Sequence, residues 1–426
     1  MKNTCRASRS LWTVVLLTVL FTACASRPYE GVQADQASFI SRAITQEDHE
    51  LRISASVPDA VETKALTGLD LYAQGIQPVW IKVENKSQTR ARVAIRSIDS
   101  EYYSPIEVAY MNRKKFSSEG YDNLQRWFYE NRLPRFIPSG ETRSGLVFTH
   151  LRRGTKGFNM TVFSSKTAHD FTFFVPLPGF VADFMHVDFA SLYNEGEMRE
   201  VDHPTLKTIL EDELSCCATD KTGELQGGPL NVVLVGSGLA VRRAMLRGGW
   251  METSIKQGEA ERARLQSFRG RQPDAIYIKN RGDGNERIQL KLWLTPWSTS
   301  GEPVWVGMVY YFTTDTSALG FLSPETLRNS ELLSFFVEES VMADLDGAQR
   351  FLFQNIWYNG SLSRIGFASG VGQSSVEEPR TSFGGAAYFT DGYRVVMFLS
   401  EEPKALNEVQ FLKNMRRNID PTGGLR

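Results

Sequence analysis

The stretch PLNVVLVGSGLAVRRAMLRGGW, residues 229–250, and the stretch ERIQLKLWLTPW, residues 286–297, decide the fold of the C-terminal half. Residues 230–235 are almost all aliphatic, which is typical of a strand that is covered on both faces. A Gly-Ser-Gly turn around Ser237 then interrupts the run, and apolar residues follow at helical spacing. The pattern predicts a strand, a tight turn and a helix that Ser237 caps.

The turn around Ser237 lacks two known chemical signatures. A dinucleotide-binding fingerprint needs a third glycine where Val241 stands. A nucleophile elbow needs one residue between each glycine and the serine, and this turn has none. We therefore interpret Ser237 as a helix cap, with anion binding at the helix N-terminus as the alternative.

The first residues resemble a bacterial lipoprotein signal peptide. Three basic residues precede an apolar run over residues 11–21, and the sequence Phe-Thr-Ala-Cys ends at Cys24. The resemblance implies removal of residues 1–23 and attachment of a lipid anchor to Cys24, which would tether a soluble body to the membrane. Ala25 stands where an inner-membrane retention signal usually has Asp, so we expect the outer membrane, facing the periplasm. An ordinary signal peptide or an uncleaved anchor is the alternative.

Composition excludes some classes of partner. The chain has 426 residues, of which 42% are hydrophobic, enough to bury more than one core. Its formal net charge of −1 becomes −4 once residues 1–23, with three basic and no acidic side chains, are removed. This charge excludes the basic field of a nucleic-acid-binding protein. No His or Cys pair has metal-ligand spacing, so we expect neither a metal nor another cofactor.

The N-terminal half is predicted to be a β-sandwich over residues 48–182, preceded by a polar, lipidated tether over residues 24–47. Short runs of alternating apolar and polar residues recur between turn residues, as from Leu51 to Val57. A helix over residues 123–131 is expected to cap one end. The domain is similar in pattern to immunoglobulin-like modules, although it lacks their cysteine pair.

Residues 183–228 are predicted to connect the two halves and to include a short helix over 204–214. They also hold Cys216 and Cys217, the only cysteines in the body after Cys24. Adjacent cysteines close a strained ring, so we favour two thiols, with a disulfide as the alternative.

Residues 229–400 are predicted to form one α+β domain. Apolar spacing predicts a helix with Asp346 as its cap. An Asp-Gly pair between the apolar runs of residues 388–399 predicts a hairpin with a type I′ turn. Residues 401–426 are predicted to be a terminal helix and tail. The fold class is therefore β plus α+β, an N-terminal β-sandwich followed by a C-terminal α+β mixed-sheet domain.

Motifs across this domain occur in the order and spacing of the LssY C-terminal domain, a bacterial module of unknown function. They are VVLVGS (232–237), Gly249-Trp250, ERIQLKLWLTPW (286–297), PVWVGM (303–308), DLDGAQR (344–350) and YFTDGYRVVMFL (388–399). The resemblance covers about residues 229–400. It implies a location at the envelope and suggests phospholipid contact, because relatives carry membrane-embedded lipid-phosphatase domains. Relatives usually have histidines where this chain has Ile288, Gln289 and Phe336, so a reaction that needs them would be lost here.

Polar residues that match the family pattern give one catalytic hypothesis. Asp283 and Asp346 would act as acid and base, while Arg281 and Arg350 hold an anionic group and Ser237 contributes to binding. The alternative makes Asp346 a helix cap and places Asp283 in a turn. The chain after residue 229 has no His or Cys, which excludes a Ser-His triad or a thiol nucleophile from that domain alone.

Three functions are compatible with the sequence. The leading hypothesis is a non-catalytic envelope lipoprotein, a binding or adaptor module with a protein partner in the envelope. The second is a hydrolase or transferase that acts on a phospholipid-related substrate through carboxylates. The third is a carrier of an apolar ligand, whose pocket aromatic residues would line. These aromatic residues are Trp293, Trp297, Trp305, Phe335 and Phe336. An adaptor should instead have an exposed apolar patch.

Overall fold

The chain divides into two compact units, an N-terminal unit over Met1–Pro178 and a C-terminal unit over Gly179–Arg426. The computed structural model describes residue 29 and residues 31–152, 154–175, 177–179, 182–253, 266–281, 286–315, 338–341, 343–382 and 387–416. The predicted signal peptide and Cys24 lie outside these residues.

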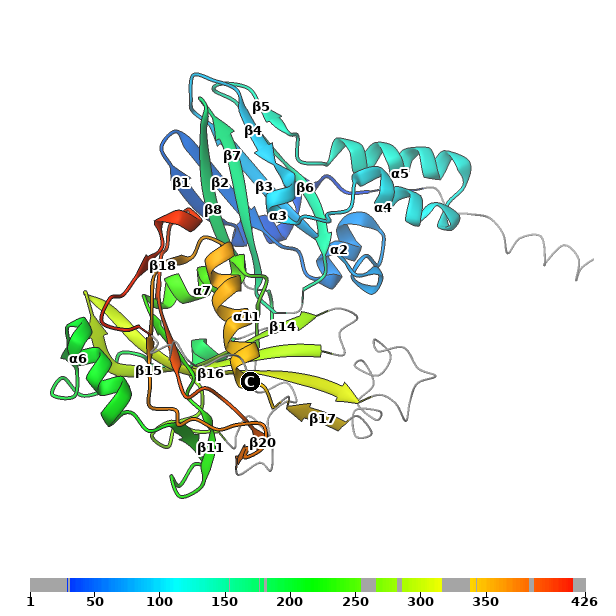
Figure 1. The fold of residues 1–426 in the computed structure, drawn as a ribbon. Coiled ribbons are helices and arrows are strands. Elements are labelled where there is room, and N and C mark those ends of the chain that lie inside the picture. The colour runs from blue at the N-terminus through cyan, green and yellow to red at the C-terminus, as the bar shows by residue number, and fades with distance from the viewer. Residues whose placement is uncertain are drawn as a thin grey trace, which may run out of the picture. The chain divides into compact units, whose positions relative to one another are not determined.

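The N-terminal unit is a β-sandwich of two four-stranded sheets, which confirms the predicted architecture (Figure 1). One sheet has the order β1 (Ile44–Asp48), β2 (Leu51–Ser56), β3 (Ile76–Asn85), β6 (Thr142–His150), with antiparallel pairing throughout. The other has the order β5 (Phe136–Ile137), β4 (Ala91–Ala94), β7 (Lys156–Ser164), β8 (Thr167–Val175). Inward-facing residues of both sheets, such as Ile81 and Phe173, form one core.

Helices close this unit with a second apolar cluster. They are α2 (Ala60–Thr67), α4 (Pro105–Met111) and α5 (Ser118–Glu130), whereas α3 (Ile95–Ile98) packs into the core between the two sheets. The predicted helix over 123–131 is α5, and it buries Leu124, Trp127 and Phe128. The predicted tether over 24–47 is partly packed structure, because Phe39 is buried in the same cluster and its carbonyl accepts a hydrogen bond from Ser56 Oγ at 2.7 Å.

The C-terminal unit is built on one mixed sheet of ten described strands. Eight follow the order β13 (Met251–Glu252), β14 (Ala275–Arg281), β15 (Glu286–Thr299), β16 (Glu302–Asp315), β12 (Val232–Val235), β21 (Arg394–Leu399), β18 (Leu362–Ala368), β22 (Gln410–Phe411). β9 (Arg199–Glu200) joins β15, and β17 (Glu338–Val341) joins β16. β12 runs antiparallel to β16 and parallel to β21, so the strand predicted as doubly covered lies inside the sheet.

Helices cover both faces of this sheet. Val232 and Leu234 pack with α7 (Gly238–Arg247) and α11 (Leu345–Tyr358), which lie side by side (Figure 1). Val233 and Val235 point to the opposite face because strand residues alternate, and they pack with α6 (His203–Thr208) and the π-helical turn η7 (Ile209–Glu213). Residues 183–228, predicted as a connector, therefore supply the cover of one face.

A buried arginine fixes that cover to the sheet. Arg394 at the start of β21 is fully buried, and its guanidinium donates to six backbone carbonyls of the described residues. The acceptors are Leu230, Leu210, Ser369, Leu214, Ser215 and Gly370. Burial lowers the pKa of Arg394 to about 10. The Arg394 side chain thus joins η7 and the segment that follows it to β21, to the segment before β12 and to the segment after β18.

Two local predictions for the C-terminal unit are wrong. The hairpin over 388–399 does not form, because β21 pairs with β12 and β18, whereas Tyr388 belongs to β20 (Ala387–Tyr388), which pairs with β19 (Arg380–Thr381). In the described residues 401–416, one 3-10 turn, η10 (Leu406–Glu408), stands in place of the predicted terminal helix. Leu412 and Met415 instead exchange backbone hydrogen bonds with β18, as from Leu412 N to the Ile365 carbonyl at 2.8 Å.

The favoured pair of thiols is a third correction. Cys216 and Cys217 form a disulfide at the start of β10 (Cys217–Thr219). β10 pairs with β11 (Gln226–Pro229), and the register of this pair shifts between Cys217 and Thr219. The ring therefore lies where the strand pairing is already irregular.

Candidate functional site

Ser237 is the residue before α7, and its side chain forms hydrogen bonds within the chain. The backbone N–H of Ala240 donates to Ser237 Oγ at 3.0 Å, which confirms the predicted cap. The Ser237 hydroxyl donates in turn to Glu401 Oε1 at 2.8 Å, and Arg243 donates to the other oxygen of that carboxylate at 3.0 Å. A carboxylate of the chain thus occupies the position where the alternative interpretation placed a bound anion.

Asp346 is not the cap of α11. The cap is Asp344, whose Oδ1 accepts from the backbone N–H of Gly347 at 2.8 Å. Asp346 lies in the first turn, where Oδ1 accepts from the Thr390 hydroxyl and Oδ2 from the backbone N–H of Asp391, both at 2.8 Å. Both oxygens therefore anchor the segment that leads into β21.

The structure describes one member of the proposed acid-base pair, Asp346. Asp283 lies outside the described residues, as does the side chain of Arg281, whose backbone ends β14. Arg350 is exposed on α11. The structure therefore places Asp346 and Arg350 on one helix and does not test their proposed partners.

The aromatic residues proposed to line an apolar pocket are mostly core. Trp293, Trp297 and Trp305 have exposed fractions of 0%, 4% and 5%. Buried indole N–H groups need an acceptor, and Trp305 Nε1 donates to the Gly236 carbonyl at 3.0 Å. Phe335 and Phe336 lie outside the described residues.

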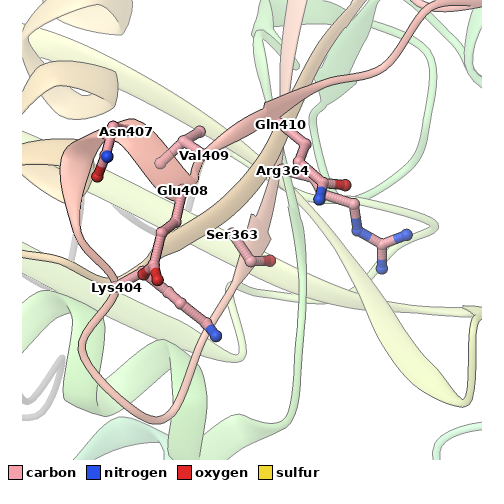
Figure 2. Close-up of a pocket in the computed structure, with 7 residues that line it drawn as sticks. All are labelled: Ser363, Arg364, Lys404, Asn407, Glu408, Val409 and Gln410. Carbon is pink, nitrogen blue, oxygen red and sulfur yellow. The ribbon is translucent and has the colours of Figure 1, made fainter.

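A polar hollow lies beside β18, between Ser363 and Arg364 on one side and residues 404–410 on the other (Figure 2). Ser363 Oγ donates to the Phe398 carbonyl at 2.9 Å, and Arg364 stacks over the Phe398 ring at 4.3 Å. Burial, and then the charge of Arg364, lower the pKa of the adjacent His203. Among the described residues that line the hollow, one carboxylate is present, and it caps a 3-10 turn. This arrangement lacks the second carboxylate that the catalytic hypothesis requires.

In the N-terminal unit, α4 and α5 lie against each other (Figure 1), and both carry exposed aromatic or apolar residues. Tyr110 and Tyr129 are each 54% exposed. Arg113 lies over the Tyr110 ring at 3.7 Å from the guanidinium carbon to the ring centre, and Arg132 lies over the Tyr129 ring at 3.5 Å. Ile106 and Met111 of α4 are exposed too, and we call these six residues the α4–α5 surface.

The segment that carries the α4–α5 surface has a mixed charge. Residues 105–135 contain six basic and four acidic side chains, a net charge of +2 in a chain whose total is −1. Sequence analysis did not identify this surface. Tyrosines on a helix can follow the same spacing whether they are exposed or packed in the core, so spacing alone does not distinguish the two. The stacking of an arginine on each tyrosine becomes visible only once both helices are placed.

The fold of the C-terminal unit defines an α+β domain on a mixed sheet, whose motif residues serve as helix caps and loop anchors. Residues 265–393 match the family model described as the LssY C-terminus. This match confirms the resemblance for that segment, whereas β12 and α7 precede it. A comparison with the curated proteins finds no match. Among the described residues, none forms a helix long and apolar enough to cross a membrane.

Proposed function

We propose that this protein is a lipid-tethered lipoprotein of the bacterial envelope that binds a protein partner through the α4–α5 surface. The observation that carries the proposal is the pair of exposed tyrosines, each stacked under an arginine. Tyrosine and arginine are enriched in the residues that contribute most to protein–protein binding. Both stacks are preformed, so less side-chain entropy is lost on binding.

The charges around this surface favour a protein over a lipid bilayer as the partner. Basic residues such as Lys114 and Lys115 attract acidic groups, but Glu119, Asp122 and Glu130 lie between the basic positions in sequence. An anionic bilayer would repel these carboxylates, whereas a protein surface can match both signs. We therefore assign the surface to a protein with acidic groups around an apolar centre.

Two further observations support a binding role over the alternatives. Both oxygens of Asp346 accept hydrogen bonds from residues 390 and 391, which gives this carboxylate a structural role in holding the segment before β21. A carrier role would require the tryptophans to line a cavity, and three of them are packed in the cores.

The lipid tether is part of this proposal and rests on the sequence around Cys24. We expect the wild-type protein to incorporate radiolabelled palmitate and to sediment with the outer membrane. The Cys24→Ser variant should retain its signal peptide and carry no label. Labelling of Cys24→Ser equal to that of wild type would contradict the tether.

Site-specific photo-crosslinking in intact cells tests the partner. A photoreactive phenylalanine at position 110 or 129 should give one discrete protein adduct. The control position is Tyr358, which is 66% exposed in the C-terminal unit and should not give this adduct. Adducts with lipid alone, or the same adducts at all three positions, would overturn the proposal.

A further inference from the structure

The disulfide between Cys216 and Cys217 contributes little as a structural crosslink. A crosslink stabilises a fold by closing a loop in the unfolded chain, and the contribution grows with the length of that loop. Here the two residues are adjacent, so the bond restrains no other part of the chain. Its presence calls for a different explanation.

Hydrogen-bond donors surround both sulfur atoms. Gln226 Nε2 donates to Cys216 Sγ at 2.7 Å, and Arg380 Nη2 lies 3.7 Å from the same atom. The Tyr388 hydroxyl lies 3.8 Å from Cys217 Sγ. A disulfide sulfur is a weak acceptor, whereas a thiolate accepts strongly, so this set of donors is suited to the reduced form.

The strand pair β19–β20 positions two of these donors. Arg380 and Tyr388 are directly opposite each other in its register, and one reaches each sulfur. Arg380 also donates to the Val371 carbonyl and to Gln226 Oε1. In the part of the chain that the structure describes, no carboxylate forms an ion pair with Arg380. Its positive charge is therefore available to stabilise a thiolate at Cys216.

The two sulfurs differ in access. Cys216 is half-buried, whereas Cys217 is 2% exposed. An incoming thiolate can therefore reach Cys216 Sγ and has no direct path to Cys217 Sγ. Burial raises the pKa of Tyr388, which keeps its hydroxyl protonated beside the inner sulfur.

From this geometry we propose that Cys216–Cys217 is a reversible thiol–disulfide exchange site for a dithiol reductant, with Cys216 as the attacked sulfur and Arg380 as the group that stabilises its thiolate. This site is independent of the α4–α5 surface. It lies beside the segment that matches the LssY C-terminus, and that segment supplies Arg380 and Tyr388.

The exchange balances as two electron-pair steps. One thiolate of the reductant attacks Cys216 Sγ, the bond to Cys217 breaks, and Cys217 Sγ leaves as a thiolate that accepts a hydrogen bond from Tyr388 and then takes a proton from solvent. The second thiolate of the reductant then attacks the reductant's first sulfur, which is bonded to Cys216 Sγ. That bond breaks, and Cys216 leaves as a thiolate. The reductant becomes a cyclic disulfide, two electrons enter the protein, and the reverse sequence restores the ring.

The test titrates the purified full chain with mixtures of reduced and oxidised dithiothreitol. Free thiols are trapped with N-ethylmaleimide and assigned by peptide mass spectrometry to residues 216 and 217. We expect no label at 216 and 217 in the oxidised protein, two labels after reduction, an unchanged circular dichroism spectrum, and loss of the labels on reoxidation. Labels before reduction, or reduction only in denaturant, would overturn the proposal.

The pH dependence of alkylation tests the role of Arg380. In the reduced wild type, Cys216 should react with an apparent pKa below the ordinary value of about 8.5. Arg380→Met should raise this value by about one pH unit, and Arg380→Lys should restore most of it. The control is Arg416→Met, which removes an exposed arginine of the same unit. A wild-type value at or above 8.5, or equal shifts in Arg380→Met and Arg416→Met, would contradict the role.

Discussion

The N-terminal unit exposes two tyrosines on α4 and α5, whereas the C-terminal unit buries Trp293, Trp297 and Trp305 in its cores. Tyr110 and Tyr129 are each 54% exposed, and Trp293 is fully buried. The tyrosines have arginines stacked on them, whereas Trp293 donates its indole N–H to the Arg271 carbonyl at 3.2 Å. We therefore propose recognition as the role of the two exposed tyrosines and cohesion as that of the three buried tryptophans.

This difference predicts which substitutions affect stability and which affect binding. A buried aromatic ring contributes transfer free energy and fills volume, so its loss leaves a cavity. An exposed ring contributes little to folding, because water already contacts much of it.

The largest expected effect is that of Trp293→Ala. We expect it to lower the free energy of unfolding of the C-terminal unit by about 3–5 kcal/mol, because the ring is removed from the core. Tyr129→Ala should change the stability of the N-terminal unit by less than about 0.5 kcal/mol. Urea unfolding followed by tryptophan fluorescence and circular dichroism measures both. Equal destabilisation by the two substitutions would remove the contrast between the units.

The next largest effect is that of Arg394→Met, which removes the side chain that joins η7 to the sheet. We expect a loss of about 3 kcal/mol in the C-terminal unit, because buried carbonyls lose their donor. Hydrogen exchange of residues 206–215 should accelerate most. Arg416→Met is the matched control, and we expect it to leave stability within about 0.5 kcal/mol of wild type. Unchanged exchange over 206–215 in Arg394→Met would show that the cover does not depend on this side chain.

A smaller effect concerns the pH response of the N-terminal unit. Lys156 is 2% exposed, and burial lowers its pKa to about 7 from the ordinary 10.5. Between these values the unfolded chain holds the extra proton, so the free energy of unfolding should rise with pH, by about 1 kcal/mol per pH unit. Lys156→Met should flatten this rise.

Exposed Lys86 provides the control for that experiment. Lys86→Met should leave the slope between pH 7 and pH 9 as it is in wild type. Urea unfolding of the N-terminal unit at a series of pH values measures the slope. A wild-type stability that falls with rising pH in this range would contradict the buried, neutral lysine.

The smallest effect is that of Ser237→Ala at the start of α7. Loss of the cap should cost the C-terminal unit about 1 kcal/mol. Ser237→Asp keeps an acceptor for the same N–H, but its carboxylate should lower stability through repulsion from Glu401. Thermal unfolding with and without 0.5 M salt separates the two contributions. A Ser237→Ala protein as stable as wild type would make the cap irrelevant to the fold.

Periodicity and turn residues predicted the strand at residues 232–235, the helix that follows it and the sandwich, because each depends on local spacing. They did not predict pairing over long distances. The run before Leu399 looked like half of a hairpin, but its neighbour is β12, more than 150 residues earlier. β18 was missed because Ser363, Arg364 and Gly366 interrupt its apolar pattern.

The candidate surface was harder to predict than the fold. Periodicity places Leu124 and Phe128 on the buried side of α5, but it cannot show that Tyr129 stays exposed or that Arg132 stacks on it. The donors around Cys216 come from positions 226 and 380, so only the folded chain brings them together. Sequence spacing shows that Cys216 and Cys217 are adjacent, but it carries no signal for the donors around them or for the arginines stacked on the tyrosines.

The most direct test of the account measures binding of the partner identified by photo-crosslinking. The dissociation constant is compared for the purified wild-type lipoprotein, a Tyr110→Ala/Tyr129→Ala double variant and the control Tyr358→Ala. We predict that the double variant binds at least about tenfold more weakly while its unfolding is unchanged, and that Tyr358→Ala binds as wild type does. Equal affinity of all three proteins would contradict the assignment of recognition to the α4–α5 surface.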